Sequence, residues 1–128
     1  GFDLNDFMNP DPEWGVRESA DLGRLMAEAV TNMNALTIAS IHGNCIGGGV
    51  VLAASCDLRV ATDSANFVIP EVDLGIPLAW GGIPRLVREI GPAATKELVL
   101  TCRRFYPEEA KSLGFSISSV IGIRHWHL

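Results

Sequence analysis

The sequence predicts an α/β fold, because segments with strand character alternate with segments of helical length. A β-branched run at 36–41 leads through consecutive glycines into an apolar, alanine-rich segment over about 48–56. A second run of strand character, at 57–61, follows directly. Since strands that alternate with helices are typical of parallel sheets, we expect the strands of this domain to be parallel.

The N-terminal half divides into segments by its residue pattern. Residues 5–15 combine acidic groups with two prolines and a glycine, so we expect a loop there. Apolar residues recur at helical spacing over 16–33, which predicts an amphipathic helix. The strand at 36–41, the glycine turn and the helix over about 48–56 follow.

The C-terminal half starts with the strand at 57–61 and a short strand at 66–69. Residues 70–82 are rich in glycine and proline and predict a loop, which is a common place for functional side chains. Three helices follow, separated by glycine and proline, at 84–90, 93–101 and 107–114.

Composition bounds the class of protein. The 128 residues, 48% of them hydrophobic, are enough for one domain with a core. The formal net charge of −5 disfavours a nucleic-acid partner, and the longest stretch without a charged residue or histidine, 43–56, is too short to cross a bilayer. The three cysteines lack CxxC spacing, which indicates reduced thiols in an intracellular protein. The sequence does not distinguish a cytoplasmic, mitochondrial or peroxisomal location.

The glycine turn at Gly47–Gly49 is the most informative local feature. Glycine has no Cβ, so backbone N–H groups at the start of the following helix can approach a ligand directly. In a dry site these groups can stabilise negative charge on an oxygen. Two interpretations stay open: an oxyanion hole or anion cradle, and close packing of helix and strand with no ligand. A phosphate loop is disfavoured, because neither GxxxxGK[ST] nor GxGxxG occurs.

A series of motifs covers most of the chain. In order, they are Gly1–Leu4, Ile41–Gly49, Cys56–Arg59, Ala65–Glu71, Leu74–Ile76, Gly81–Leu86, Ile90–Gly91 and Tyr106–Gly114. Together they resemble the crotonase superfamily, the enoyl-CoA hydratase/isomerase group. The resemblance implies a crotonase-like ββα-type spiral core, truncated at both ends. Residues 1–115 are expected to form a partial domain without the N-terminal strands, and 116–128 a divergent tail in place of the C-terminal helices.

The resemblance implies an acyl-CoA thioester as substrate, with no cofactor because coenzyme A is part of that substrate. Members stabilise an enolate at the thioester oxygen with two backbone N–H groups, which fall here on Phe2 and Gly48. A full-length member is expected to form a homotrimer or hexamer. The resemblance also assigns substrate contacts to Gly1, Asp3, Leu4, Ile46, Gly47, Val51 and Trp80.

The two catalytic glutamates of the family's hydratases map to Val51 and Glu71. Valine has no acid–base capacity, so the chain departs from the hydratase pattern. A single carboxylate can move a proton between two carbons, and Δ3,Δ2-enoyl-CoA isomerases keep this second position only. An apolar wall that includes Val51 is expected to raise the pKa of Glu71. Without the family context, a carboxylate in a surface ion pair is the simpler interpretation of Glu71.

Other polar residues favour structural roles. Asp57 follows an apolar segment and is expected to hydrogen-bond backbone or an arginine. His42 is interpreted as a hydrogen-bonded histidine at a strand end. Apolar surroundings are expected to raise the thiol pKa of Cys45 and Cys56, which disfavours nucleophilic catalysis. The pair in His125–His127 is an incomplete metal site, so we expect no metal.

Three functions therefore stay open. The first is an enoyl-CoA isomerase that uses Glu71 and the Gly48 oxyanion hole. The second is a non-catalytic protein that binds CoA thioesters or serves in an assembly, which Val51 favours. The third is another crotonase-type reaction, such as hydration. We expect the full-length parent to be an enzyme, while the sequence leaves the activity of this fragment open.

Overall fold

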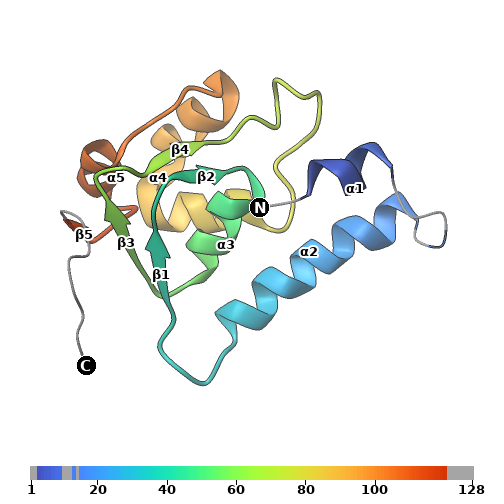
Figure 1. Ribbon diagram of the computed structural model, residues 1–128, viewed down its shortest axis with the longest axis horizontal. Helices are drawn as coiled ribbons and strands as arrows, with labels where there is room; N and C mark the ends of the chain where they lie inside the picture. Colours follow the sequence, from blue (N-terminus) through green and yellow to red (C-terminus); the bar gives the residue numbers. More distant parts are fainter. Residues whose placement is uncertain (1–2, 10–12, 14, 121–128) are drawn as a thin grey trace.

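The described part of the chain contains two small parallel sheets, which lie left of the centre in Figure 1. The computed structural model describes residues 3–9, 13 and 15–120. One sheet has the order β1-β3-β5 and the other pairs β2 with β4. All three ladders are parallel, which confirms the α/β prediction. The strands are β1 (Ile38–Ile41), β2 (Asn44–Ile46), β3 (Leu58–Thr62), β4 (Asn66–Val68) and β5 (Ser118–Val120).

The described part of the chain also contains five helices, and the two N-terminal ones lie to the right of the sheets in Figure 1. The prediction of a loop over 5–15 is wrong at its start, where the Asp3 side chain accepts a hydrogen bond from the Asn5 N–H and caps a short helix. The other helices lie where the sequence predicts them. They are α1 (Leu4–Met8), α2 (Val16–Thr31), α3 (Gly48–Ser55), α4 (Gly82–Thr101) and α5 (Pro107–Leu113).

Helix α3 is the central helix and packs against both α2 and α4. Nearly all its side chains are apolar, and five of its residues are buried, because neighbours cover it on more than one side. Beside it, the rings of Phe67 and Phe105 stack with centroids 5.0 Å apart. Phe115 meets the Phe67 ring edge-on at 5.7 Å, so the core joins β4 to the segments on either side of α5.

A buried arginine connects three parts of the fold. The Arg59 side chain in β3 donates hydrogen bonds to the carbonyl oxygens of Phe115 and Cys56, and to Glu89 Oε2 on α4 at 2.7 Å. Only 3% of Arg59 is exposed, so these partners replace the water that its charge would otherwise need. Asp57 has the structural role that we expected, because its carboxylate accepts hydrogen bonds from the N–H and hydroxyl of Thr37.

Local patterns missed two strands and placed one break correctly. Strand β2 lies between the predicted strand at 36–41 and the glycine turn, and β5 lies within 116–128, where it pairs with β3. The division of the chain at residue 115 stays a prediction. The expected break before Pro92 is present, because Gly91 interrupts α4 with a non-helical backbone (φ 82°, ψ 165°). Within the described residues, no helix is both long and apolar enough to cross a membrane.

Candidate active site

The parallel pairing of β2 and β4 brings the glycine turn next to the loop that carries Glu71. Ile46 and Val68, the last residues of the two strands, are partners in the ladder. In a parallel pair both chains leave the sheet at the same edge. Gly47 follows at once on one side, where its N–H donates to the Val68 carbonyl at 2.9 Å, and Glu71 follows three residues after Val68 on the other.

Gly47 is required at the turn for two reasons. Its φ of 53° and ψ of −112° are a conformation that side chains with a Cβ rarely adopt. A Cβ at this position would also lie 2.5 Å from Oε1 of Glu71. The carbonyl of Gly47 accepts hydrogen bonds from the N–H groups of Val50 and Val51 and so starts α3. The close packing and the open helix start are therefore present together.

The Glu71 carboxylate is held in a position with few polar neighbours. The main-chain carbonyl of Glu71 accepts hydrogen bonds from the N–H groups of Leu74 and Ile76, both at 3.0 Å, which fixes the backbone of the turn. Oε2 is buried and has no hydrogen-bond partner in the described part of the chain. Burial raises the pKa of the Glu71 carboxyl, while a hydrogen bond from its own backbone N–H acts in the opposite direction. No surface ion pair of Glu71 occurs among the described residues.

Trp80 lies at the start of α3. A Cβ on Gly48 would overlap Cζ3 and Cη2 of the indole, and a Cβ on Gly23 of α2 would overlap its pyrrole side. The ring therefore bridges the space between the two helices. Arg85, which the sequence reasoning did not single out, donates a hydrogen bond to the Trp80 carbonyl at 3.1 Å. No spacing rule points to Gly23 or Arg85, because both act through contacts between separate elements.

The other residues that we expected at the substrate site differ in their exposure to solvent. Ile46 is 39% exposed at the end of β2, whereas Val51 is fully buried. A Cβ on Gly82 would lie 2.7 Å from a Val51 methyl, so Val51 packs toward the start of α4. Asp3 is exposed and caps α1. Gly1, Phe2 and the side chain of Leu4 lie outside the described residues.

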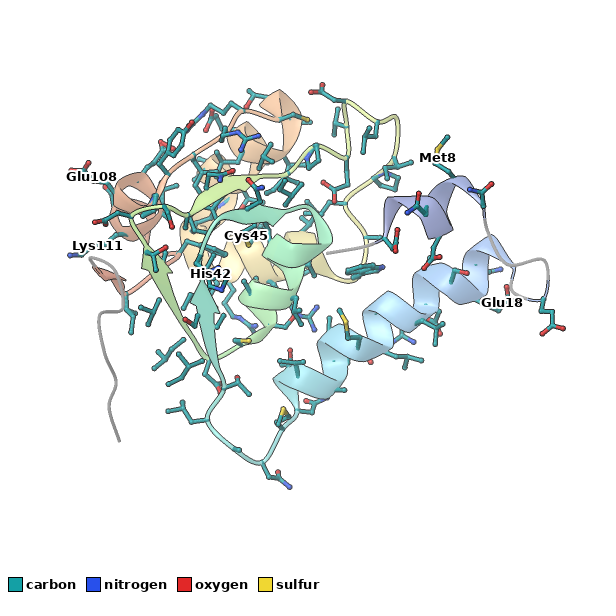
Figure 2. All side chains as sticks on the ribbon, viewed as in Figure 1. Met8, Glu18, His42, Cys45, Glu108 and Lys111 are labelled. Carbon is teal, nitrogen blue, oxygen red and sulfur yellow. The ribbon has the colours of Figure 1, made fainter. Side chains whose placement is uncertain are left out.

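Metal and thiol chemistry find little support in the described residues. No group of three or more metal-ligating side chains occurs among them, and His125–His127 lies outside them. Cys45 lies in the interior (Figure 2), where burial raises its thiol pKa to about 11. His42 is exposed just after β1. Among the described residues, Glu71 places a carboxylate against the glycine turn.

The arrangement can stabilise an enolate and move a proton. The first N–H groups of a helix have no partner within the helix, so the N–H of Gly48 is available to an oxygen that gains negative charge. Glu71 lies on the other side of Gly47, and its raised pKa suits a base that must also return its proton. Main-chain hydrogen bonds fix the backbone at Gly47 and at Glu71.

Comparison with known proteins identifies the same family. Residues 1–121 match the family model described as Enoyl-CoA hydratase/isomerase. Over 85 residues the chain is 51% identical to Delta(3,5)-Delta(2,4)-dienoyl-CoA isomerase, peroxisomal, of Arabidopsis thaliana. The aligned segment covers 66% of this chain and 30% of that relative. Over 98 residues it is 42% identical to Methylglutaconyl-CoA hydratase, mitochondrial, of Rattus norvegicus. That aligned segment covers 77% of this chain and 31% of the relative.

A solved structure agrees with this result. The crystal structure of enoyl-CoA hydratase from Bacillus anthracis superposes with a TM-score of 0.88 at 36% identity, over 94% of this chain and 46% of that one. The chain thus spans less than half the length of these relatives. The crotonase-like fold is confirmed, and the chain belongs to the enoyl-CoA hydratase/isomerase family.

Proposed function

We propose that the protein that contains this chain isomerises the double bond of an enoyl-CoA thioester. The observation that carries the proposal is the position of Glu71, whose carboxylate lies against Gly47 with one oxygen buried and without a hydrogen-bond partner among the described residues. The thioester oxygen binds at the N–H of Gly48. The N–H of Phe2 is proposed as the second donor on the strength of the family resemblance.

The reaction moves one proton and needs no cofactor. Glu71 removes a proton from C2 of a 3-enoyl-CoA, and the electron pair of the C–H bond moves toward the thioester oxygen to form an enolate. The N–H of Gly48 stabilises the negative charge on that oxygen. The resulting carboxylic acid of Glu71 then returns the proton to C4, which leaves a 2-enoyl-CoA and restores the carboxylate.

Hydration is the second candidate, because several relatives are named as hydratases. Adding water across a double bond requires a group to activate the water and a group to donate the proton. Val51 supplies neither, and it is fully buried. A non-catalytic CoA-thioester-binding protein is the third candidate.

The proposal also includes an intracellular location and assembly into a homotrimer or hexamer. It places Ile46 and Trp80 beside the acyl group of the substrate.

Product analysis separates these candidates. A 3-enoyl-CoA and a 2-enoyl-CoA are incubated with the purified protein, and the thioesters are separated by chromatography. We expect 2-enoyl-CoA from the first substrate. Formation of 3-hydroxyacyl-CoA alone, from the second substrate, contradicts isomerisation and supports hydration. Binding of thioesters with no product from either substrate supports the binding protein.

Glu71→Gln tests the base. We expect turnover to fall about 10²–10⁴-fold, the range for loss of a general base, with thioester affinity unchanged. Glu108→Gln, at an exposed position on α5 (Figure 2), is the matched control and is expected to keep full activity. The deprotonated carboxylate is the active form, so kcat/KM of the unchanged protein should fall as the pH drops through a pKa above the ordinary value of 4.5. Full turnover in Glu71→Gln would assign the base to another residue.

A further inference from the structure

Trp80 has a backbone conformation that is costly for a bulky residue. Its φ is 59°, in the left-handed region, and the next residue, Gly81, has a φ of 69°. Glycine adopts this conformation readily, but a tryptophan keeps it only where its surroundings hold it in place. Strain of this kind is often found at functional sites, so the surroundings of Trp80 need an explanation.

Arg85 holds this strained turn. One guanidinium nitrogen donates to the carbonyl oxygens of Trp80 at 3.1 Å and Gly81 at 3.0 Å. A second nitrogen donates to the hydroxyl of Thr31 at 3.3 Å. Arg85 therefore connects the turn before α4 to the end of α2 through hydrogen bonds.

The held indole fills a passage between two helices. Its six-membered ring lies against Gly48 of α3 and its pyrrole side against Gly23 of α2, and neither glycine leaves room for a Cβ. On the α2 side lies an open surface hollow of about 540 Å³. The hollow is lined by Trp80 and by exposed residues of α2: Arg17, Glu18, Ala20, Asp21 and Arg24.

We infer that Trp80 limits the length of the acyl group, and that Arg85 is the positioning residue that keeps the indole in place. The inference rests on the proposed function, because it takes the N–H of Gly48 as the binding point of the thioester oxygen. An acyl chain attached to a carbonyl at that point meets the indole beside Gly48. The ring fills the space between this point and α2, so the site selects short acyl groups.

The first test measures thioester binding without turnover. Dissociation constants of butanoyl-, hexanoyl- and decanoyl-CoA are measured by calorimetry for the purified protein and for Trp80→Asn. Asparagine removes the ring and still tolerates the left-handed backbone. We expect the unchanged protein to bind decanoyl-CoA no more tightly than butanoyl-CoA. Trp80→Asn should bind decanoyl-CoA about tenfold more tightly than the unchanged protein does, because methylene groups are then buried in the space between α3 and α2 that the indole leaves.

Gly23→Ala tests the same idea with the indole present. Alanine has the higher helix propensity, so α2 should persist, while the added methyl group overlaps the ring and forces it to move. The ratio of the decanoyl-CoA to butanoyl-CoA dissociation constants must then change.

Arg85→Gln tests the positioning role. It should change this ratio in the same direction as Trp80→Asn, and Arg85→Lys should restore part of the original ratio. Arg88→Gln is the matched control, because Arg88 is exposed on the same helix. An unchanged ratio in Arg85→Gln overturns the role of Arg85.

Other outcomes separate this inference from the proposed function. The same ratio in Trp80→Asn as in the unchanged protein overturns the inference alone. Failure to bind any of the three thioesters overturns it together with the proposed acyl-CoA function. Absence of isomerase activity, combined with a ratio that changes in Trp80→Asn, supports the inference and overturns only the proposed chemistry.

Discussion

At the scale of single residues, Glu71 combines a structural cost with a chemical use. Its carboxylate is partly buried. Among the described residues, it has no charged partner that would compensate for the loss of water around it. Folding raises its pKa, so the native state holds the proton more tightly than the unfolded state. The free energy of unfolding therefore falls as the pH rises from the ordinary carboxyl pKa through the raised one.

Glu71→Gln is expected to stabilise the fold at neutral pH. Glutamine keeps the shape of the side chain and removes the buried negative charge. We expect a higher free energy of unfolding in urea than for the unchanged protein at about pH 7. The difference should shrink at a pH well below 4.5, where the carboxyl of the unchanged protein is protonated in both states. Glu108→Gln is the control, and a lower stability of Glu71→Gln at neutral pH would contradict the argument.

At the scale of elements, the kink in α4 depends on one glycine. Gly91 has φ 82° and ψ 165°, a combination almost confined to glycine, and a Cβ there would meet no neighbour. The Thr95 hydroxyl donates a hydrogen bond to the Gly91 carbonyl at 2.7 Å. The kink therefore lets α4 continue past Pro92, which cannot donate a helix hydrogen bond.

Gly91→Ala tests backbone strain without steric overlap. We expect it to lower the free energy of unfolding by about 1–3 kcal/mol, the usual cost of a strained backbone conformation. Gly49→Ala in α3 is the matched control, because its added Cβ would make an ordinary contact at 3.9 Å with the Cys45 sulfur. Helix propensity predicts that this control is neutral or stabilising. Equal stability of Gly91→Ala and the unchanged protein would show that the kink carries no strain.

At the scale of the whole molecule, the described chain leaves apolar surface at a sheet edge. Strand β1 pairs with β3 on one side and with no other strand in the described part of the chain. Ile38 in this strand is 56% exposed and Leu36 just before it is 69% exposed. An open strand edge with apolar side chains is a template for pairing with another chain.

Ile38→Lys is expected to reduce self-association of this chain. A charge on an edge strand opposes pairing between copies, while substitution at an exposed position should change the free energy of unfolding by no more than about 0.5 kcal/mol. Light scattering across a range of protein concentrations measures the effect. Leu100→Lys, at a 66% exposed position on α4, changes charge and apolar area away from any strand and serves as the control. An equal effect of both substitutions would assign the change to net charge.

Local patterns determined most of the elements. Helical spacing identified α2, glycine and proline identified the ends of α4 and α5, and the glycine run identified the start of α3. These features depend on neighbours within a few residues, which the sequence displays directly. The motifs also identified the family, which the family match over 1–121 confirms.

Only the tertiary structure decided how these elements form a site. The pairing of β2 with β4 brings Glu71 beside Gly47, although the two residues are distant in the sequence. The position of the indole between Gly23 and Gly48, and its support by Arg85, likewise depend on how α2, α3 and α4 pack. The sequence by itself determined the fold class and the family, and it predicted that Val51 replaces one carboxylate of the family's hydratases. It left the site's contacts undecided, because they arise between elements whose separation along the chain no local pattern records.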